Sequence, residues 1–117
     1  GEGCTLDLEK AVAMYRKAAE NNNAGAQLNL GNMYIKGKGC KKNETEAVKW
    51  WLRAAENGNV KAIYNLAKSY MVGKGCQKNV KKAFALFQDA AARGHEEAQY
   101  RLAIMYWEGL GCDRARI

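Results

Sequence analysis

The sequence contains no proline, so nothing in its 117 residues imposes the strongest known interruption of a helix. Proline breaks helix interiors because it lacks a backbone N–H and clashes with the preceding turn. A long apolar run is also missing: the longest, Leu102–Trp107, has six residues, whereas a membrane-spanning helix needs about 20. The sequence therefore permits uninterrupted helices and offers no transmembrane segment, so we expect no membrane partner.

Residues that commonly carry catalysis are scarce. His95 is the only histidine and Ser69 the only serine. Ser69 lacks the lysine three residues further on that a penicillin-binding active site needs, and no phosphate-binding loop with a lysine and serine or threonine is present. Because His95 directly precedes Glu96 and Glu97, we expect it to cap a helix whose dipole favours those carboxylates. The sequence predicts neither an enzyme nor a cofactor.

The most prominent feature of the sequence is a four-residue phrase, Gly-x-Gly-Cys, that returns at a fixed interval. It occupies positions 1–4, 37–40, 73–76 and 109–112. Successive cysteines are therefore 36 residues apart. A fixed period of roughly 20 to 50 residues is typical of stacked repeat proteins.

The units defined by this phrase carry the same small and large side chains at equivalent positions. Recurring residues are alanine at 11, 47 and 83 and at 26, 62 and 98, leucine at 30, 66 and 102, and tyrosine at 34, 70 and 106. Repeated units place equivalent residues against equivalent neighbours. We therefore predict a single repeat domain, 1–117, which looks like a piece of a longer array. Its expected units are 1–36, 37–72, 73–108 and a partial unit, 109–117.

Each unit shows the apolar spacing of two helices. The first type is expected at 7–21, with Asp7 capping its start, and again after Asn43 and Asn79. Alanine and larger apolar residues, Met14 among them, follow the i, i+3, i+4 and i+7 spacing of a helix that buries one face. Second-type helices are expected at 24–36, 60–72 and 96–108, and the small residue after each leucine (Gly31, Ala67, Ala103) should let a neighbouring helix approach closely. The predicted fold is an all-α, right-handed solenoid of antiparallel helix pairs.

The ends of this stack carry their own expectations. We expect five helices and a frayed tail after Gly109, with the chain opening on the second helix of an incomplete unit and closing on a lone first helix. Repeat arrays need polar caps over their outer faces, so Met105 and Tyr106 should be partly bare. End-to-end self-association, or docking of neighbouring repeats, would follow.

Three sequence patterns resemble the Sel1-like repeat, a relative of the tetratricopeptide repeat. They are Gly-x-Gly closing a helix, Ala-x-x-x-Leu-x-x-x-Tyr before it, and Ala-x-x-x-Tyr/Trp-x-x-Ala-Ala after it. The segments 17–20 and 98–100 also match the family's usual sequence closely. The resemblance covers the whole chain. It implies a non-catalytic scaffold or adaptor that gathers other proteins. The loop position that usually holds valine in the family holds cysteine here.

The four cysteines are expected to be unpaired, small, buried apolar side chains that take the place of valine. Equivalent points on successive repeats lie at least about 8–10 Å apart, beyond the roughly 7 Å between Cα atoms that a disulfide allows, and the C-x-x-C type spacing of zinc sites is absent. In the family's cysteine-rich bacterial subgroup a disulfide spans the inter-helix turn, but the corresponding positions here are Ala19 and Gln27. Unpaired thiols slightly favour a reducing compartment.

The net charge of +7 is unevenly distributed along the chain. Many lysines flank the glycine phrases and would form a basic rim along the loop edge of a solenoid. This rim is either a solvated edge that keeps the protein soluble or a surface for nucleic acid. Helical repeats that read bases need a regular set of readout side chains in each unit, and no exposed stacking aromatic recurs. Nucleic-acid binding is therefore the alternative to protein binding.

A row of polar residues marks the candidate partner site on the second-type helices. Asn29, Asn65 and Arg101 are equivalent positions on the face opposite the buried one, with Asn32 and Lys68 beside them. In solenoids of paired helices such a face commonly lines the concave surface. Amides can donate to and accept from a peptide backbone, while arginine and lysine suit carboxylates. We expect an extended, acidic peptide along these residues; the alternative is a merely polar helix face.

Overall fold

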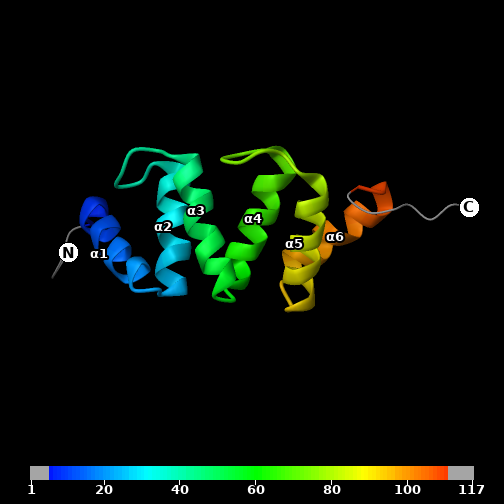
Figure 1. Cartoon of the computed structure of the whole chain (residues 1–117), viewed down its shortest axis with the longest axis horizontal. Helices are drawn as coiled ribbons and strands as arrows, with labels where there is room; N and C mark the ends of the chain where they lie inside the picture. The colour runs from blue at the N-terminus through cyan, green and yellow to red at the C-terminus, as the bar shows by residue number, and fades with distance from the viewer. Residues whose placement is uncertain (1–5, 111–117) are drawn as a thin grey trace, which may run out of the picture.

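The computed structural model describes residues 6–110, which form six α-helices and no strand. The helices are α1 (Leu8–Glu20), α2 (Ala24–Lys36), α3 (Glu44–Glu56), α4 (Val60–Val72), α5 (Val80–Ala92) and α6 (Glu96–Glu108). They follow one another along the long axis of a 63 × 27 × 26 Å molecule, with the chain ends at opposite poles (Figure 1). Among residues 6–110 no helix is both long and apolar enough to cross a membrane. The predicted all-α solenoid is confirmed.

The expected count of five helices was wrong, and so was the expected order at the ends. The chain opens on a first-type helix, α1, and closes on a second-type helix, α6. The position of the glycine phrase explains this, because 37–40 and 73–76 each precede a first-type helix and the phrase at 1–4 does the same. The expected tail lies mostly in 111–117, outside the described residues.

A polar side chain accepts a backbone hydrogen bond at the start of every helix. The capping residues are Asp7, Asn23, Asn43, Asn59, Asn79 and His95. His95 takes the place that asparagine holds in the other second-type helices, and its Nδ1 accepts the N–H of Ala98 at 3.1 Å. Each cap satisfies one of the N–H groups that a helix start leaves without a partner. The predicted capping role of His95 is confirmed.

The core runs between consecutive helices, and α3 on α2 and α5 on α4 are its closest contacts. Trp51 of α3 is buried against the backbone of α2 at Gly31, where an added Cβ would lie 2.5 Å from the indole Nε1. The small residue after each leucine was predicted to allow such an approach, and Gly31 confirms it. Met14 was expected on the buried face but is 65 % exposed, because no described helix precedes α1.

The second glycine of each described loop lies against the start of the first-type helix before it. A Cβ at Gly39 would overlap the carbonyl oxygen of Leu8, and one at Gly75 would overlap that of Glu44. Both glycines have left-handed backbone angles, with φ of 73° and 77°. The phrase therefore recurs because it closes a helix and also packs one repeat onto the preceding one.

The turn between α1 and α2 is held by an amide network. Gln27 is fully buried, and its Nε2 donates to the carbonyl oxygen of Ala19 at 3.0 Å. Its Oε1 accepts from Asn57 Nδ2, in the next turn of the stack, at 3.1 Å. Gln99 repeats the first bond, to Ala91, at 3.1 Å. The same side-chain hydrogen bond thus spans the inter-helix turn in the first and third repeats.

Candidate functional site

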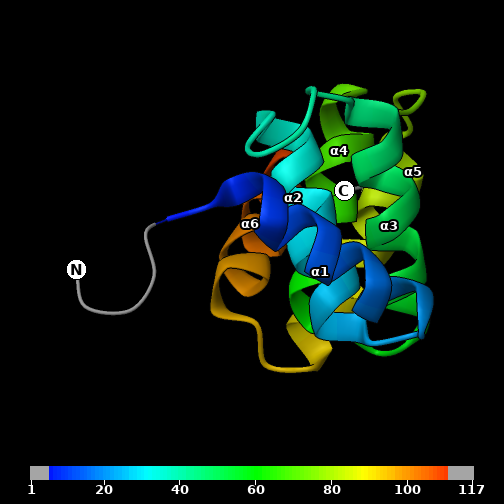
Figure 2. The same cartoon turned by 90° about the vertical axis from the view of Figure 1, so that its left-hand side faces the viewer.

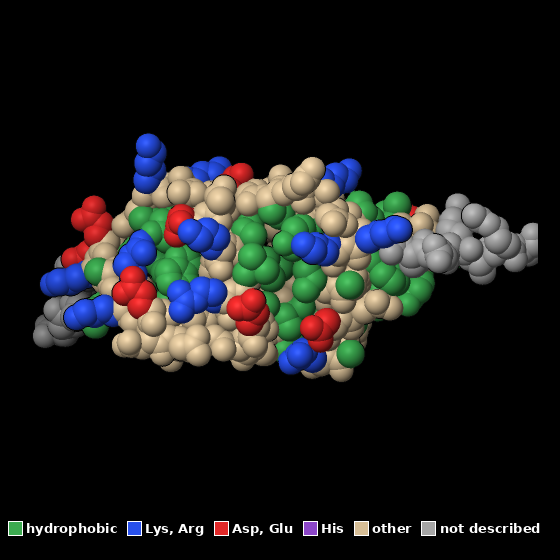
Figure 3. Space-filling model, viewed as in Figure 1, with side chains coloured by type: hydrophobic (Ala, Val, Ile, Leu, Met, Phe, Trp, Pro, Cys, Tyr) green, Lys and Arg blue, Asp and Glu red, His purple; other side chains and the backbone are tan. Residues whose placement is uncertain are grey.

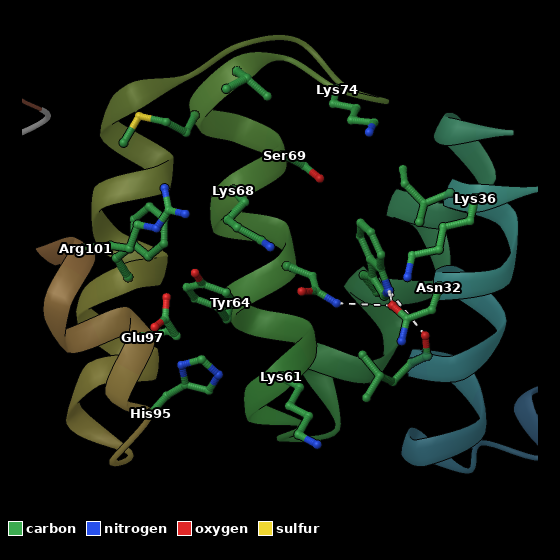
Figure 4. A pocket seen from close by; sticks show the side chains of 17 residues that line it. Asn32, Lys36, Lys61, Tyr64, Lys68, Ser69, Lys74, His95, Glu97 and Arg101 are labelled. Carbon is green, nitrogen blue, oxygen red and sulfur yellow. Dashed lines mark hydrogen bonds between the residues drawn. The ribbon is translucent and has the colours of Figure 1, made fainter.

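A groove of about 710 Å³ crosses the second-type helices α2, α4 and α6. Its floor includes Trp51, Tyr64 and Phe87, all of them buried. Polar and charged side chains stand around this floor (Figure 4). The groove is therefore an apolar trough with a hydrophilic rim.

Four of the five predicted site residues line this groove. They are Asn32 from α2, Asn65 and Lys68 from α4, and Arg101 from α6. Asn32, Lys68 and Arg101 are labelled in Figure 4. Asn29 is half-buried on α2 and is not part of the lining. The structure brings the four together, and their binding role stays a prediction.

The position of Asn29 follows from the two edges of a second-type helix. The α2 edge that faces α4 carries Asn32 and Lys36, whereas the α6 edge that faces α4 carries Arg101. Asn29 is the α2 equivalent of Arg101, two repeats earlier. Asn29 therefore lies on the edge of α2 that would face a preceding second-type helix. No such helix precedes α2 among the described residues.

Two asparagines are fixed in orientation at the centre of the groove. The Oδ1 atom of Asn32 accepts hydrogen bonds from Trp51 Nε1 at 3.2 Å and from Asn65 Nδ2 at 3.3 Å. Trp51 Nε1 also donates to the carbonyl oxygen of Leu28 at 3.3 Å. Within residues 6–110 no hydrogen bond uses Asn32 Nδ2 or Asn65 Oδ1. One donor and one acceptor therefore remain for a ligand.

The rim of the groove is strongly basic. Its cationic side chains are Lys36, Lys61, Lys68, Lys74 and Arg101, all exposed, and Glu97 is the one carboxylate of the lining. None of these cations lies within ion-pair distance of a carboxylate in the described part of the chain. The positive charge of these side chains can therefore attract an anionic ligand to the groove.

Sequence reasoning missed Lys61 and assigned Lys36 and Lys74 to the loop edge instead of the groove. A signal for Lys61 was present: with Asn65 and Lys68 it has the i, i+4, i+7 spacing of one helix face. The two loop-edge lysines could not be placed in the same way, because their reach toward α4 depends on how the loops fold.

The aromatic rings of the groove are packed and not presented to solvent. Tyr64 stacks on His95 with ring centroids 4.5 Å apart and meets Phe87 edge-on at 5.8 Å. Lys68 Nζ lies 4.9 Å from the centroid of the Tyr64 ring. Tyr64 itself is only 8 % exposed. Such rings stabilise the trough but give no open face on which a nucleobase could stack.

The two cysteines in the described part of the chain, Cys40 and Cys76, are unpaired and half-buried. Each packs at the border of the core, and each thiol lies within hydrogen-bond distance of a loop carbonyl, that of Lys38 or Lys74. They are less buried than the expected valine-like side chains, because the loops that carry them lie at the edge of the stack. Cys4 and Cys112 lie outside the described residues. No three histidine, cysteine, aspartate or glutamate side chains within 6–110 gather as they would around a metal ion.

We predict slow thiol reactions at Cys40 and Cys76 in the folded protein. Burial raises the pKa of both thiols, although Arg16 opposes the shift at Cys40 and Lys82 at Cys76. A raised pKa leaves less of the reactive thiolate at neutral pH, so modification should still be accelerating with pH above about 8.5, where an unperturbed thiol is half ionised. Thiol titration of a Cys4→Val, Cys112→Val variant, with and without denaturant, measures this. Equal rates in the two conditions would contradict the prediction.

The family model of the Sel1 repeat matches the chain at residues 1–23, 24–59, 60–95 and 96–115. A Sel1 repeat protein from Oxalobacter formigenes is 39% identical, with a TM-score of 0.91 over 96% of this chain and 46% of that one. The c5321 protective antigen of uropathogenic Escherichia coli is 37% identical, with a TM-score of 0.93 over 97% of this chain and 24% of that one. No curated protein matches the chain.

A third solved structure is similar along more of its own length. Cysteine-rich protein B of Helicobacter pylori is 29% identical, with a TM-score of 0.79 over 83% of this chain and 73% of that one. The chain spans less than half of the first two proteins. The match of the family model along almost every residue confirms the resemblance drawn from the glycine phrase and the alanine pattern. The chain belongs to the Sel1 repeat family.

Proposed function

We propose that this chain is a non-catalytic scaffold segment that binds an extended, acidic stretch of a partner protein in the groove across α2, α4 and α6. Sel1 repeat proteins are helical-repeat scaffolds that typically mediate protein–protein interactions, and the family is generally non-catalytic. The single observation that carries the finer proposal is the basic rim without internal carboxylate partners, set around the asparagine pair.

The asparagine pair is suited to a peptide main chain. Asn32 Nδ2 can donate to a peptide carbonyl and Asn65 Oδ1 can accept a peptide N–H, because their other amide atoms are already bonded within the protein. Lys68 and Arg101 flank this pair and would pair with Asp or Glu side chains of the ligand. An extended ligand leaves its main chain open to such contacts.

A single-stranded nucleic acid is the weaker candidate for the same groove. Its phosphates would suit the lysines, but base-stacking platforms are aromatic faces open to solvent. The floor rings Trp51, Tyr64 and Phe87 are all buried. The groove therefore favours a ligand whose recognition rests on charge and main-chain hydrogen bonds.

Replacing Asn65 or Arg101 by alanine should weaken binding of an acidic peptide by about 1–3 kcal/mol each. Each change removes a ligand contact while leaving the buried floor intact, so stability should change little. Fluorescence anisotropy with a labelled, mixed-sequence peptide pool rich in Asp and Glu measures binding, and urea unfolding measures stability. Asn29→Ala is the matched control for Asn65, because it alters the equivalent residue outside the groove.

Unchanged binding by the Asn65→Ala, Arg101→Ala double variant would place the ligand elsewhere, on the basic loop edge. Loss of binding in Asn29→Ala as well would show that the whole asparagine row is used and not the groove alone. A labelled single-stranded oligonucleotide serves as the second probe. Tighter binding of that probe, with a steep decrease as salt is added, would favour nucleic acid over peptide.

A further inference from the structure

The outer face of α6 carries large apolar side chains that no described helix covers. Tyr100, Ala103, Ile104 and Trp107 share this face at the i, i+3, i+4, i+7 spacing, and Trp107 is 86 % exposed. Figure 3 shows green side chains gathered at the α6 end of the molecule. Exposed apolar patches of this kind commonly mark interaction sites.

Two of these four positions are covered on the other second-type helices, whereas the α4 equivalents of Ile104 and Trp107, Lys68 and Met71, line the groove. Tyr64 and Ala67 of α4 are equivalent to Tyr100 and Ala103, and both are buried where α5 packs on α4. On α2 the equivalent of Ala103 is Gly31, which lies under the Trp51 ring of α3. At the positions equivalent to Tyr100 and Ala103, the occupant within the described residues is a first-type helix.

The opposite pole of the molecule bears an uncovered first-type helix. In α3 the residues that face α2 are fully or almost fully buried, whereas their α1 equivalents, Ala11, Tyr15 and Ala18, are only half-buried and Met14 is exposed. Figure 2 shows α1 at the front of this pole, with no helix covering it. Each chain therefore presents one half of the internal contact at each end.

We infer that α6 of one copy binds α1 of a second copy in the register that α2·α3 and α4·α5 use within the chain. Tyr15 of the second copy would take the place of Trp51 and Phe87. It would lie over Ala103 and against Tyr100, as Phe87 lies edge-on to Tyr64 at 5.8 Å. This inference goes beyond the proposed peptide binding, since it uses the ends of the stack and not the groove.

The charges of the two helices favour this pairing over pairing of like ends. The α6 helix contains Glu96, Glu97 and Glu108 against Arg101, a balance of −2. The α1 helix contains three basic and two acidic residues, a balance of +1. Two α6 helices would repel each other, whereas α6 and α1 attract.

The contact is heterologous, so each bound copy leaves one α1 face and one α6 face open. Contacts of this type form open chains unless a rotation closes them into a ring. We therefore expect a concentration-dependent series of dimers and longer oligomers.

Sedimentation velocity of the full chain, from low micromolar to millimolar concentration, tests the inference. Ala103→Arg places a long cation where Trp51 meets Gly31 in the internal contact, and it should weaken association at least about tenfold. Ala11→Arg should do the same from the other side, with the exposed Met14→Lys as a second variant if Ala11→Arg disturbs α1. Ala85→Arg, at an exposed alanine on α5, is the matched control and should associate like the unaltered chain.

Mixing distinguishes the two ways in which the faces could pair. Ala103→Arg keeps a working α1 face and Ala11→Arg keeps a working α6 face, so an equimolar mixture should form dimers and stop there. A mixture that stays monomeric while the unaltered chain associates would overturn the α6–α1 pairing. So would a monomeric unaltered chain at the highest concentration, or unchanged association of Ala103→Arg.

Discussion

Gly75→Ala is expected to destabilise the fold by about 3 kcal/mol or more, because the substitution acts in two ways at once. A left-handed backbone costs a residue with a side chain roughly 1–2 kcal/mol, and Gly75 has φ of 77°. The new Cβ would also overlap the carbonyl oxygen of Glu44. That oxygen belongs to the first turn of α3 and cannot move without shifting the helix, which adds about 1–3 kcal/mol.

Gly94→Ala separates these two costs. Gly94 also has a left-handed backbone, with φ of 92°, but an added Cβ there meets nothing within 4 Å. Its substitution should therefore cost only the conformational part, roughly 1–2 kcal/mol. Urea unfolding of both variants, compared at equal m-values, measures the difference. Equal destabilisation would mean that the loop moves off α3 easily, and that the second glycine is required for its backbone angle alone.

Gln27→Leu is expected to cost about 2 kcal/mol, because it removes two hydrogen bonds of a fully buried amide at about 1 kcal/mol each. The substitution keeps a similar side-chain volume but removes the donor to the Ala19 carbonyl and the acceptor for Asn57. Gln27 and Ala19 are both fully buried, so water cannot replace the bond to the Ala19 carbonyl, which keeps only its bond from the N–H of Asn22.

Gln99→Leu is the matched control for Gln27→Leu. Gln99 makes the same bond to a turn carbonyl, that of Ala91, but it is exposed. Water can therefore take over, and the cost should stay below about 1 kcal/mol. Thermal or urea unfolding of both variants gives the comparison. A similar loss for the two substitutions would show that burial does not decide the strength of this bond.

The parts of the fold that could be predicted from the sequence are those set within one helix. Asp7, Asn43 and Asn79 were expected at helix starts, and each accepts the backbone N–H three residues later. The Ala26–Leu30–Tyr34 face is buried as the helical spacing indicates. Such features need only the period of a helix and the chemistry of its ends.

Features set by neighbouring helices were predicted less well. Met105 was expected to be partly bare like Tyr106, yet it is buried, while Tyr106 is 55 % exposed as expected. Met105 is part of the cluster formed with α4 and α5. Adjacent residues on a helix point about 100° apart, so knowing which pole is open does not say which of the two is covered.

In the candidate site, too, the features set within one helix were predicted and those set by neighbouring helices were not. Asn32 and Asn65 could be placed on one face of the second-type helices, but their direct hydrogen bond of 3.3 Å joins helices 33 residues apart in the sequence. The bond that Asn32 accepts from Trp51 depends on a third helix. Because these contacts are set by helix packing, the row of equivalent positions, which includes Asn29, differs from the set that the groove brings together.

The way in which the helices are stacked has a consequence for a ligand that lies across α2, α4 and α6. Each helix packs mainly against the helices next to it in sequence, so opening of one pole need not be felt at the other. In such linear arrays, unfolding advances one unit at a time from the ends. A bound peptide would touch three units at once and would add contacts between second-type helices, of which α2 and α4 already share the Asn32–Asn65 hydrogen bond. Occupancy would then change the cooperativity of the array and not only its stability, so that segments able to fray separately would open together.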